Sequence, residues 1–110
     1  MSLDIWIRCE HCDSVLGDDC MNITHNLGKM ADAAGIYDCL WRPDENEIKY
    51  ARQMIDPLQR GLAKLEADPA RFEALNSPNG WGLYENFVPF VRRVLAVCEN
   101  HPGGLVEVSR

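Results

Sequence analysis

Apolar and polar residues alternate at both ends of the chain, and this period of two predicts β-strands. In residues 3–8 (LDIWIR), Leu and the two Ile lie on one face and Asp, Trp and Arg on the other. The residues EHCD (10–13) predict a turn, and SVLGDD (14–19) predicts a short returning strand before a Gly-Asp break. The residues LVEVSR (105–110) predict a final strand.

Between these strands, apolar residues recur every three or four positions, which predicts helices. The expected helices span residues 22–34, 43–67, 68–75 and 84–98, and IYDCLW (36–41) predicts a helical turn packed on the core. Gly35 lies where the first helix should end, and Pro43 lies in the first turn of the second. In the third, Phe72 and Leu75 are expected to face inward.

Two prolines lie inside predicted helices, where a proline removes one backbone hydrogen bond and crowds the preceding turn. Pro57 therefore predicts a kink, or two helices that meet at Asp56-Pro57, and Pro89 predicts a bent or delayed helix. The residues NSPNGWG (76–82) are dense in turn formers and predict a loop.

The order of these elements predicts a single α+β domain over residues 1–110 that is mostly helical. The N- and C-terminal strands are expected to pair in a small sheet, with the helices packed on one face. The helix over 84–98 carries the strongest apolar stripe, so we expect it to cover the sheet.

Composition excludes several classes of function. The chain has 110 residues, 46% apolar and 25% charged, which are ordinary values for one globular domain. Its formal charge is −6 and it has no run of Lys or Arg, which argues against nucleic-acid binding. No apolar run approaches the ~20 residues that cross a bilayer. With an odd number of cysteines and no signal-peptide pattern, we expect a cytoplasmic protein with reduced thiols.

The stretch NITHNLGKM (22–30) gathers polar residues at the start of a predicted helix. On a helical wheel Asn22, His25 and Lys29 share the polar face, and Asn26 lies at the edge of the apolar stripe. One interpretation is structural, with Asn22 as the N-cap and the other side chains solvated. In the other, free amide protons, His25 and Lys29 bind a carboxylate or phosphate of a small ligand or a partner peptide.

The loop NGWG (79–82) is the expected second wall of such a site, since Trp81 and Tyr84 lie one helical turn apart and have polar tips. The alternative is that Trp81 fills the edge of the core beneath the loop. The predicted ligand-binding residues are Asn22, His25, Asn26, Lys29, Trp81 and Tyr84.

The segment CEHC (9–12) has the spacing of half a zinc site, because zinc takes four nitrogen or sulfur ligands in a tetrahedron. The predicted metal ligands are Cys9, Cys12, Cys20 and His25, with His11 as an alternative. Cys20 and His25 are spaced more widely than usual and no second C-x-x-C exists, so plain surface thiols are the competing interpretation. Cys39 and Cys98 are expected in the core.

Motifs for catalysis are absent: the chain has no G-x-S-x-G, no H-E-x-x-H and no phosphate-binding glycine loop. We therefore expect a non-enzymatic module that binds a partner protein or a small anionic ligand, with zinc the only cofactor suggested. A third hypothesis is a small hydrolase or transferase with His25 as general base, which needs a nucleophile within hydrogen-bond reach. A terminal strand at a sheet edge also allows a homodimer.

Several segments together resemble a family of small uncharacterised proteins of bacteria and their phages. They are NITHNLGKM, AGIYDCLW, NGWGLYENFVPFV and the terminal VEVSR after CENHP. The resemblance spans nearly the whole chain apart from CEHC. It implies that the polar cluster at 22–30 and the NGWG loop form a shared surface, and it implies no activity.

Overall fold

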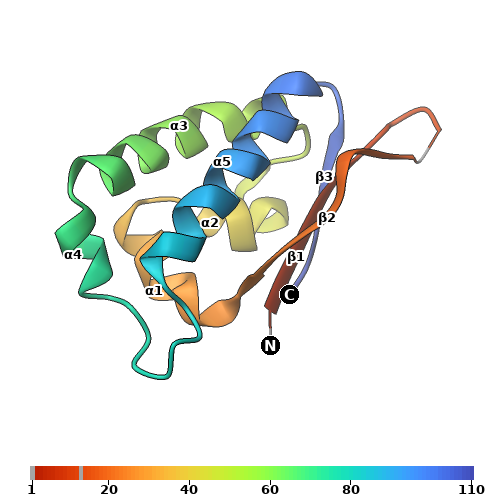
Figure 1. Ribbon diagram of the computed structural model, residues 1–110. Coiled ribbons are helices and arrows are strands. Elements are labelled where there is room, and N and C mark those ends of the chain that lie inside the picture. The colour runs from red at the N-terminus through yellow and green to blue at the C-terminus, as the bar shows by residue number, and fades with distance from the viewer. Residues whose placement is uncertain (1, 13) are drawn as a thin grey trace.

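The computed structural model describes residues 2–12 and 14–110, with the side chains of residues 18–20 left out of the description. The helices and strands follow the expected order, and the α+β fold is confirmed (Figure 1). The elements are β1 (Ser2–Arg8), β2 (Val15–Thr24), the 3₁₀ helix η1 (His25–Leu27), α1 (Gly28–Ala33), α2 (Tyr37–Trp41), the 3₁₀ helix η2 (Pro43–Asn46), α3 (Arg52–Ala67), α4 (Pro69–Glu73), α5 (Tyr84–Asn100) and β3 (Leu105–Ser109).

The sheet is antiparallel with the order β2-β1-β3, so the two ends of the chain pair as predicted. Ile5 lies opposite Val108 and Ile7 lies opposite Val106. The period of two in β1 buries Leu3, Ile5 and Ile7 completely on one face. All helices lie on that side of the sheet (Figure 1), which confirms the predicted layering.

The long helix α5 covers the sheet and packs against α3. Its stripe is buried as the sequence predicts, over Phe87, Val88, Val91, Val94, Leu95 and Cys98. Pro89 does not delay this helix, and Pro57 does not divide α3; each proline is the sixth residue of a continuous helix. There a proline removes a single bond near the helix start, which the rest of the helix tolerates.

The helical structure is interrupted instead before α3, which starts only at Arg52. The expected helix over 43–67 is therefore wrong in its first third. Only the short η2 forms after Pro43. Glu47 then takes the left-handed conformation at φ 59°, and Tyr50 forms a bridge with Leu105 of β3. Pairing with the sheet edge therefore replaces two turns of helix.

The predicted helix over residues 22–34 is also wrong at its start. Strand β2 is longer than expected and continues to Thr24, so Asn22 is a strand residue opposite Asp4. The helical segment begins at His25, and Thr24 is its N-cap, with Thr24 Oγ1 accepting the Asn26 N–H at 3.3 Å. Met21 and Ile23 are both buried, which shows that the alternation of a strand persists past the expected helix start.

The exposure of three apolar residues tests the shorter helical segments. Trp41 is 2% exposed and stacks on Tyr37 at 5.3 Å between ring centroids, which confirms that residues 36–41 form a helical turn on the core. Phe72 of α4 is buried as expected, but Leu75 is not inward-facing, because α4 ends at Glu73.

Among the described residues, no helix combines the length and the apolar character that crossing a membrane requires.

Candidate functional site

The polar cluster of the sequence lies where β2 leads into η1, beside the loop that precedes α5. Asn22, His25, Asn26 and Trp81 line one hollow of about 620 Å³, together with Ser2, Thr24 and Asn79. Lys29 lies in an adjoining hollow of about 470 Å³, which it shares with His25, Asn26 and residues 74–78. Five of the six predicted ligand-binding residues therefore lie around two hollows that meet at His25 and Asn26.

Tyr84 is the exception, since it lines neither hollow. Its hydroxyl donates a hydrogen bond to the backbone carbonyl of Leu65 at 2.7 Å and so joins α5 to α3. Burial raises the pKa of Tyr84, and the carboxylates of Glu66 and Glu73 add to the rise. Tyr84 is thus a structural residue rather than part of the candidate site.

Trp81 does not fill the core edge: 70% of the residue is exposed. The loop that carries it is held against η1, because Asn26 Nδ2 donates to the Trp81 carbonyl at 2.6 Å. Within the loop, the Trp81 N–H donates to Asn79 Oδ1 at 2.9 Å. Gly82 has a φ of 134° and passes so close to Asn26 that a β-carbon would lie 2.9 Å from the Asn26 Cβ. The indole is therefore exposed on a backbone that is fixed on both sides.

His25 is half-buried between the two hollows. Its ring makes a T-shaped contact with Trp41, with centroids 6.2 Å apart and planes at 85°. Its Nε2 atom is buried and has no hydrogen-bond partner among the described residues. The hypothesis that His25 is a general base requires a nucleophile within hydrogen-bond reach of this nitrogen. No hydroxyl or thiol of the described residues forms a hydrogen bond with His25 Nε2.

The charge of the two hollows differs from that of the chain. Neither is lined by a carboxylate, although the chain carries 17 Asp and Glu, and Lys29 supplies a cation. Asp4 is not part of the lining of the first hollow, but its Oδ1 accepts from Asn22 Nδ2 at 2.5 Å. Because Ser2 Oγ accepts from the same nitrogen at 2.9 Å, the Asn22 amide group is held by the sheet.

Exposed apolar side chains gather at the same place. Three large apolar residues of the described chain are exposed, and two of them, Trp81 and Leu75, line these hollows. The third, Val15, begins β2 at the other end of the hairpin. The sequence did not identify Leu75 as a surface residue, although its place next to the NSPNGWG loop was a signal for it.

The predicted zinc ligands do not converge on one point. Cys9, His11 and Cys12 lie at the β1–β2 turn, whereas His25 follows the opposite end of β2. At ~3.3 Å per residue, the length of β1 separates them by roughly 20 Å, so His25 cannot complete this site. The side chain of Cys20 lies outside the description. Within the described residues no three His, Cys, Asp or Glu side chains are placed to hold a metal ion.

The thiols of the turn instead make local contacts. The Cys9 Sγ accepts the His11 N–H at 3.4 Å, and Cys12 Sγ bonds to Ser14 Oγ at 3.4 Å. His101 comes near them from the end of α5 and lines a hollow of about 270 Å³ together with Cys9 and His11.

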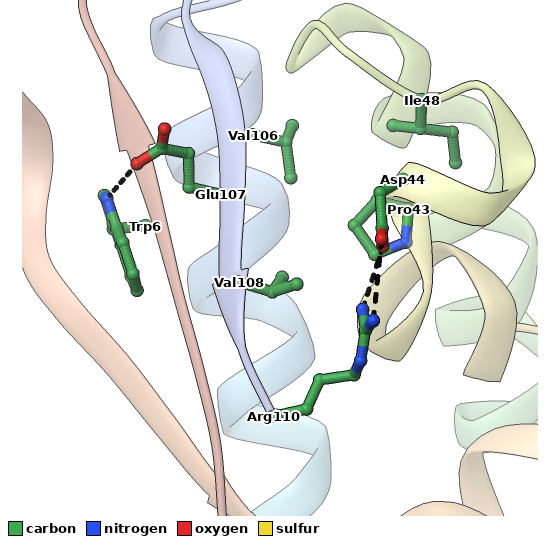
Figure 2. A pocket seen from close by; sticks show the side chains of 8 residues that line it. All are labelled: Trp6, Pro43, Asp44, Ile48, Val106, Glu107, Val108 and Arg110. Carbon is green, nitrogen blue, oxygen red and sulfur yellow. Dashed lines mark hydrogen bonds and ion pairs between the residues drawn. The ribbon is translucent and has the colours of Figure 1, made fainter.

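A further cavity of about 610 Å³ lies along the edge of β3 that faces away from β1, and it was not predicted from the sequence (Figure 2). We call it the β3-edge groove; it is lined by Val106, Val108 and Arg110 on the strand side, by Pro43, Asp44 and Ile48 on the other, and by Trp6 and Glu107 at the outer face. Arg110 closes one end, because its guanidinium donates to Asp44 Oδ1 at 2.8 Å and to the Trp41 carbonyl at 2.9 Å. This bond to Arg110 lowers the pKa of Asp44.

Comparison of the chain with family models, with curated proteins and with solved structures finds no match. The resemblance to small bacterial and phage proteins therefore stays a prediction.

Proposed function

We propose that this protein is a non-enzymatic interaction module that binds a short acidic segment of a partner protein. Its binding surface, which we call the Trp81 surface, comprises His25, Asn26, Lys29, Leu75 and Trp81 around the two adjoining hollows. The observation that carries the proposal is the exposed Trp81 indole on a loop fixed by Asn26.

An exposed tryptophan on a fixed backbone is well suited to binding a protein. Covering a tryptophan side chain removes ~150–250 Å² from water, and at ~25 cal/mol per Å² this supplies a few kcal/mol. Because the loop is already ordered, little conformational entropy is lost when the partner covers the ring. Leu75 adds a second apolar contact across the adjoining hollow.

The charge of the surface favours an acidic partner segment. Lys29 lines the second hollow, and neither hollow has a carboxylate in its lining, so an aspartate or glutamate of the partner meets no like charge in the lining. The strongly acidic remainder of the chain disfavours acidic segments elsewhere, so the charge pattern directs such a segment to this surface.

A random peptide library selected on the immobilised protein tests this function. We expect the enriched peptides to combine an apolar residue with Asp or Glu. Their affinity should fall about tenfold or more for Trp81→Ala, and to a smaller, salt-dependent extent for Lys29→Ala. Val15→Ala is the matched control, since Val15 is also exposed but lies at the other end of the hairpin.

Three results would contradict the proposal. One is enrichment of peptides that bind Trp81→Ala as well as the wild type. Another is that Val15→Ala lowers the affinity for the peptides as much as Trp81→Ala does. The third is that free acetate or phosphate displaces the peptides completely at concentrations near its own dissociation constant, which would make the surface a small-anion site.

A further inference from the structure

The first half of β3 is covered along its outer edge by the chain itself. The Val106 N–H donates to the Lys49 carbonyl at 2.9 Å, and the Ala51 N–H donates to the Gly104 carbonyl at 2.8 Å. These residues form the beginning of a fourth strand. On the N-terminal side of these residues, Glu47 takes the left-handed conformation and the chain lies away from β3. The β3-edge groove occupies the place where that strand would continue along the second half of β3 (Figure 2).

The orientation of Val108 follows from this pairing. In an antiparallel strand, successive residues direct their N–H and C=O groups to opposite sides. Since the Val106 N–H points outward to Lys49, the N–H and C=O of Val108 also point outward, away from β1. No described residue forms a hydrogen bond with them. The groove therefore contains a free backbone donor and a free backbone acceptor in strand geometry.

The side chains of the groove have two distinct characters. Val106 and Val108 point across it toward Ile48 and Pro43 (Figure 2), which gives an apolar floor. Four carboxylates border it, those of Asp44, Glu45, Glu47 and Glu107. Three of them are ion-paired, Asp44 with Arg110, Glu45 with Arg42 and Glu107 with Arg8, and no ion pair holds Glu47 among the described residues. Arg110 is the cation of the lining, and it is already bonded to Asp44.

We propose that the β3-edge groove binds an extended segment of a partner protein by strand addition at Val108, with an aliphatic residue in the groove and Lys or Arg on either side of it. The residue opposite Val108 exchanges both backbone hydrogen bonds with it, and its side chain lies on the same face as the Val108 side chain. Its two neighbours alternate to the outer face, where Glu107 lies. The lining has two carboxylates and one cation, and the carboxylate of Glu47 lies in the segment beside it, so the remaining negative charge favours Lys or Arg at these positions.

A second copy of this chain fits the edge less well than a separate segment. Two β3 strands paired symmetrically about Val108 would each place Arg110 opposite Val106 of the other copy. The Lys49 backbone already occupies that position. A separate segment does not meet this obstacle, because it can begin beyond Lys49.

Short blocked peptides in which Val alternates with Lys, Ser or Glu test the proposal, and binding is followed by NMR of the Val108 and Ile48 amides. We expect the affinity to fall in the order Lys, Ser, Glu. Methylating the amide nitrogens of the Lys peptide should weaken binding about tenfold or more, because it removes the donor and leaves the side chains. Trp81→Ala should leave binding unchanged, which separates this groove from the Trp81 surface.

Val108→Pro is the informative variant. It removes an N–H that takes no part in the pairing with β1, so the sheet retains its bonds while the outward donor is lost. Val108→Thr is the matched control, because it keeps both the N–H and the branched shape. We expect the Lys peptide to bind Val108→Thr within about twofold of the wild type and Val108→Pro about tenfold more weakly.

The proposal is overturned if none of the three peptides shifts the Val108 amide at about 1 mM, or if the N-methylated peptide binds as well as its parent. Preference for the Glu peptide overturns the assigned partner chemistry. Wild-type self-association that Val108→Pro abolishes would identify a second copy as the occupant instead. If circular dichroism shows that Val108→Pro does not fold, the comparison between the N-methylated peptide and its parent tests the proposal by itself.

Discussion

Replacing Gly61 by alanine should destabilise the protein, although Gly61 lies inside helix α3, where alanine is normally favoured. A β-carbon at this position would lie 2.2 Å from Ile36 Cγ2 and 3.3 Å from the Ala34 carbonyl oxygen. Carbon atoms prefer a separation of ~3.5–4.0 Å, so either the helix or the segment before α2 must move. The glycine is thus a requirement of close packing between α3 and residues 34–36.

The expected change in the free energy of unfolding for Gly61→Ala follows from two opposing effects. Alanine in a helix interior gains ~1 kcal/mol over glycine, whereas overpacking a buried contact costs ~1–3 kcal/mol. The contact is severe and Ile36 is fully buried, so we expect a net loss of about 1–2 kcal/mol. With a urea m-value of ~1–3 kcal/mol per M, the unfolding midpoint should fall by roughly 1 M.

Urea unfolding followed by circular dichroism measures the effect, and Ile36→Ala supplies the second half of a double-mutant cycle. Ile36→Ala removes the clashing Cγ2 and alone should cost ~2–5 kcal/mol. In that background Gly61→Ala should be neutral or stabilising, so the two changes should not be additive. Gly103→Ala is the control, because no atom lies within 4 Å of the position that its β-carbon would take. A Gly61→Ala variant more stable than the wild type, or strictly additive costs, would refute this account of the packing.

Three further outcomes are expected. Burial raises the pKa of both Cys39 and Cys98 to about 12, above the ordinary value near 9, so the contribution of these two thiols to stability should be constant below pH 9. This contribution should decrease toward pH 12 by about 1.4 kcal/mol per pH unit for each thiol, and alanine variants should flatten the resulting decline in urea midpoints. Gly82→Ala should release the loop from Asn26 and increase amide exchange at residues 79–83, with little change in global stability. Tyr84→Phe should cost ~1 kcal/mol in urea unfolding without weakening peptide binding, because the lost hydrogen bond joins two helices.

The sequence predicts those elements whose pattern and packing agree. The alternation in β1 and the stripe of α5 each have one dominant period, and both bury the residues that they indicate. The segment around Asn22 is different, because Met21 and Ile23 fit a strand while Ile23 and Leu27 fit a helix. Pairing with β1 decides between the two, and the partner strand begins about twenty positions earlier in the chain.

The candidate site was predicted in part for a similar reason. His25, Asn26 and Lys29 are neighbours in sequence, so their grouping could be read directly. The exposure of Trp81 depends on a bond from Asn26, 55 positions away. The closure of the β3-edge groove depends on the contact between Asp44 and Arg110, 66 positions apart. The pattern of neighbouring residues in the sequence does not indicate contacts between positions so far apart.

The central place of β1 has a consequence for synthesis on the ribosome. Its second neighbour, β3, is translated roughly a hundred residues later, which at ~5–20 residues per second leaves β1 with an open side for several seconds. During this interval the apolar face of the β2–β1 hairpin has neither its third strand nor the α5 cover. We therefore expect chaperones that recognise exposed strands to engage the nascent chain at Leu3, Ile5 and Ile7 until β3 emerges.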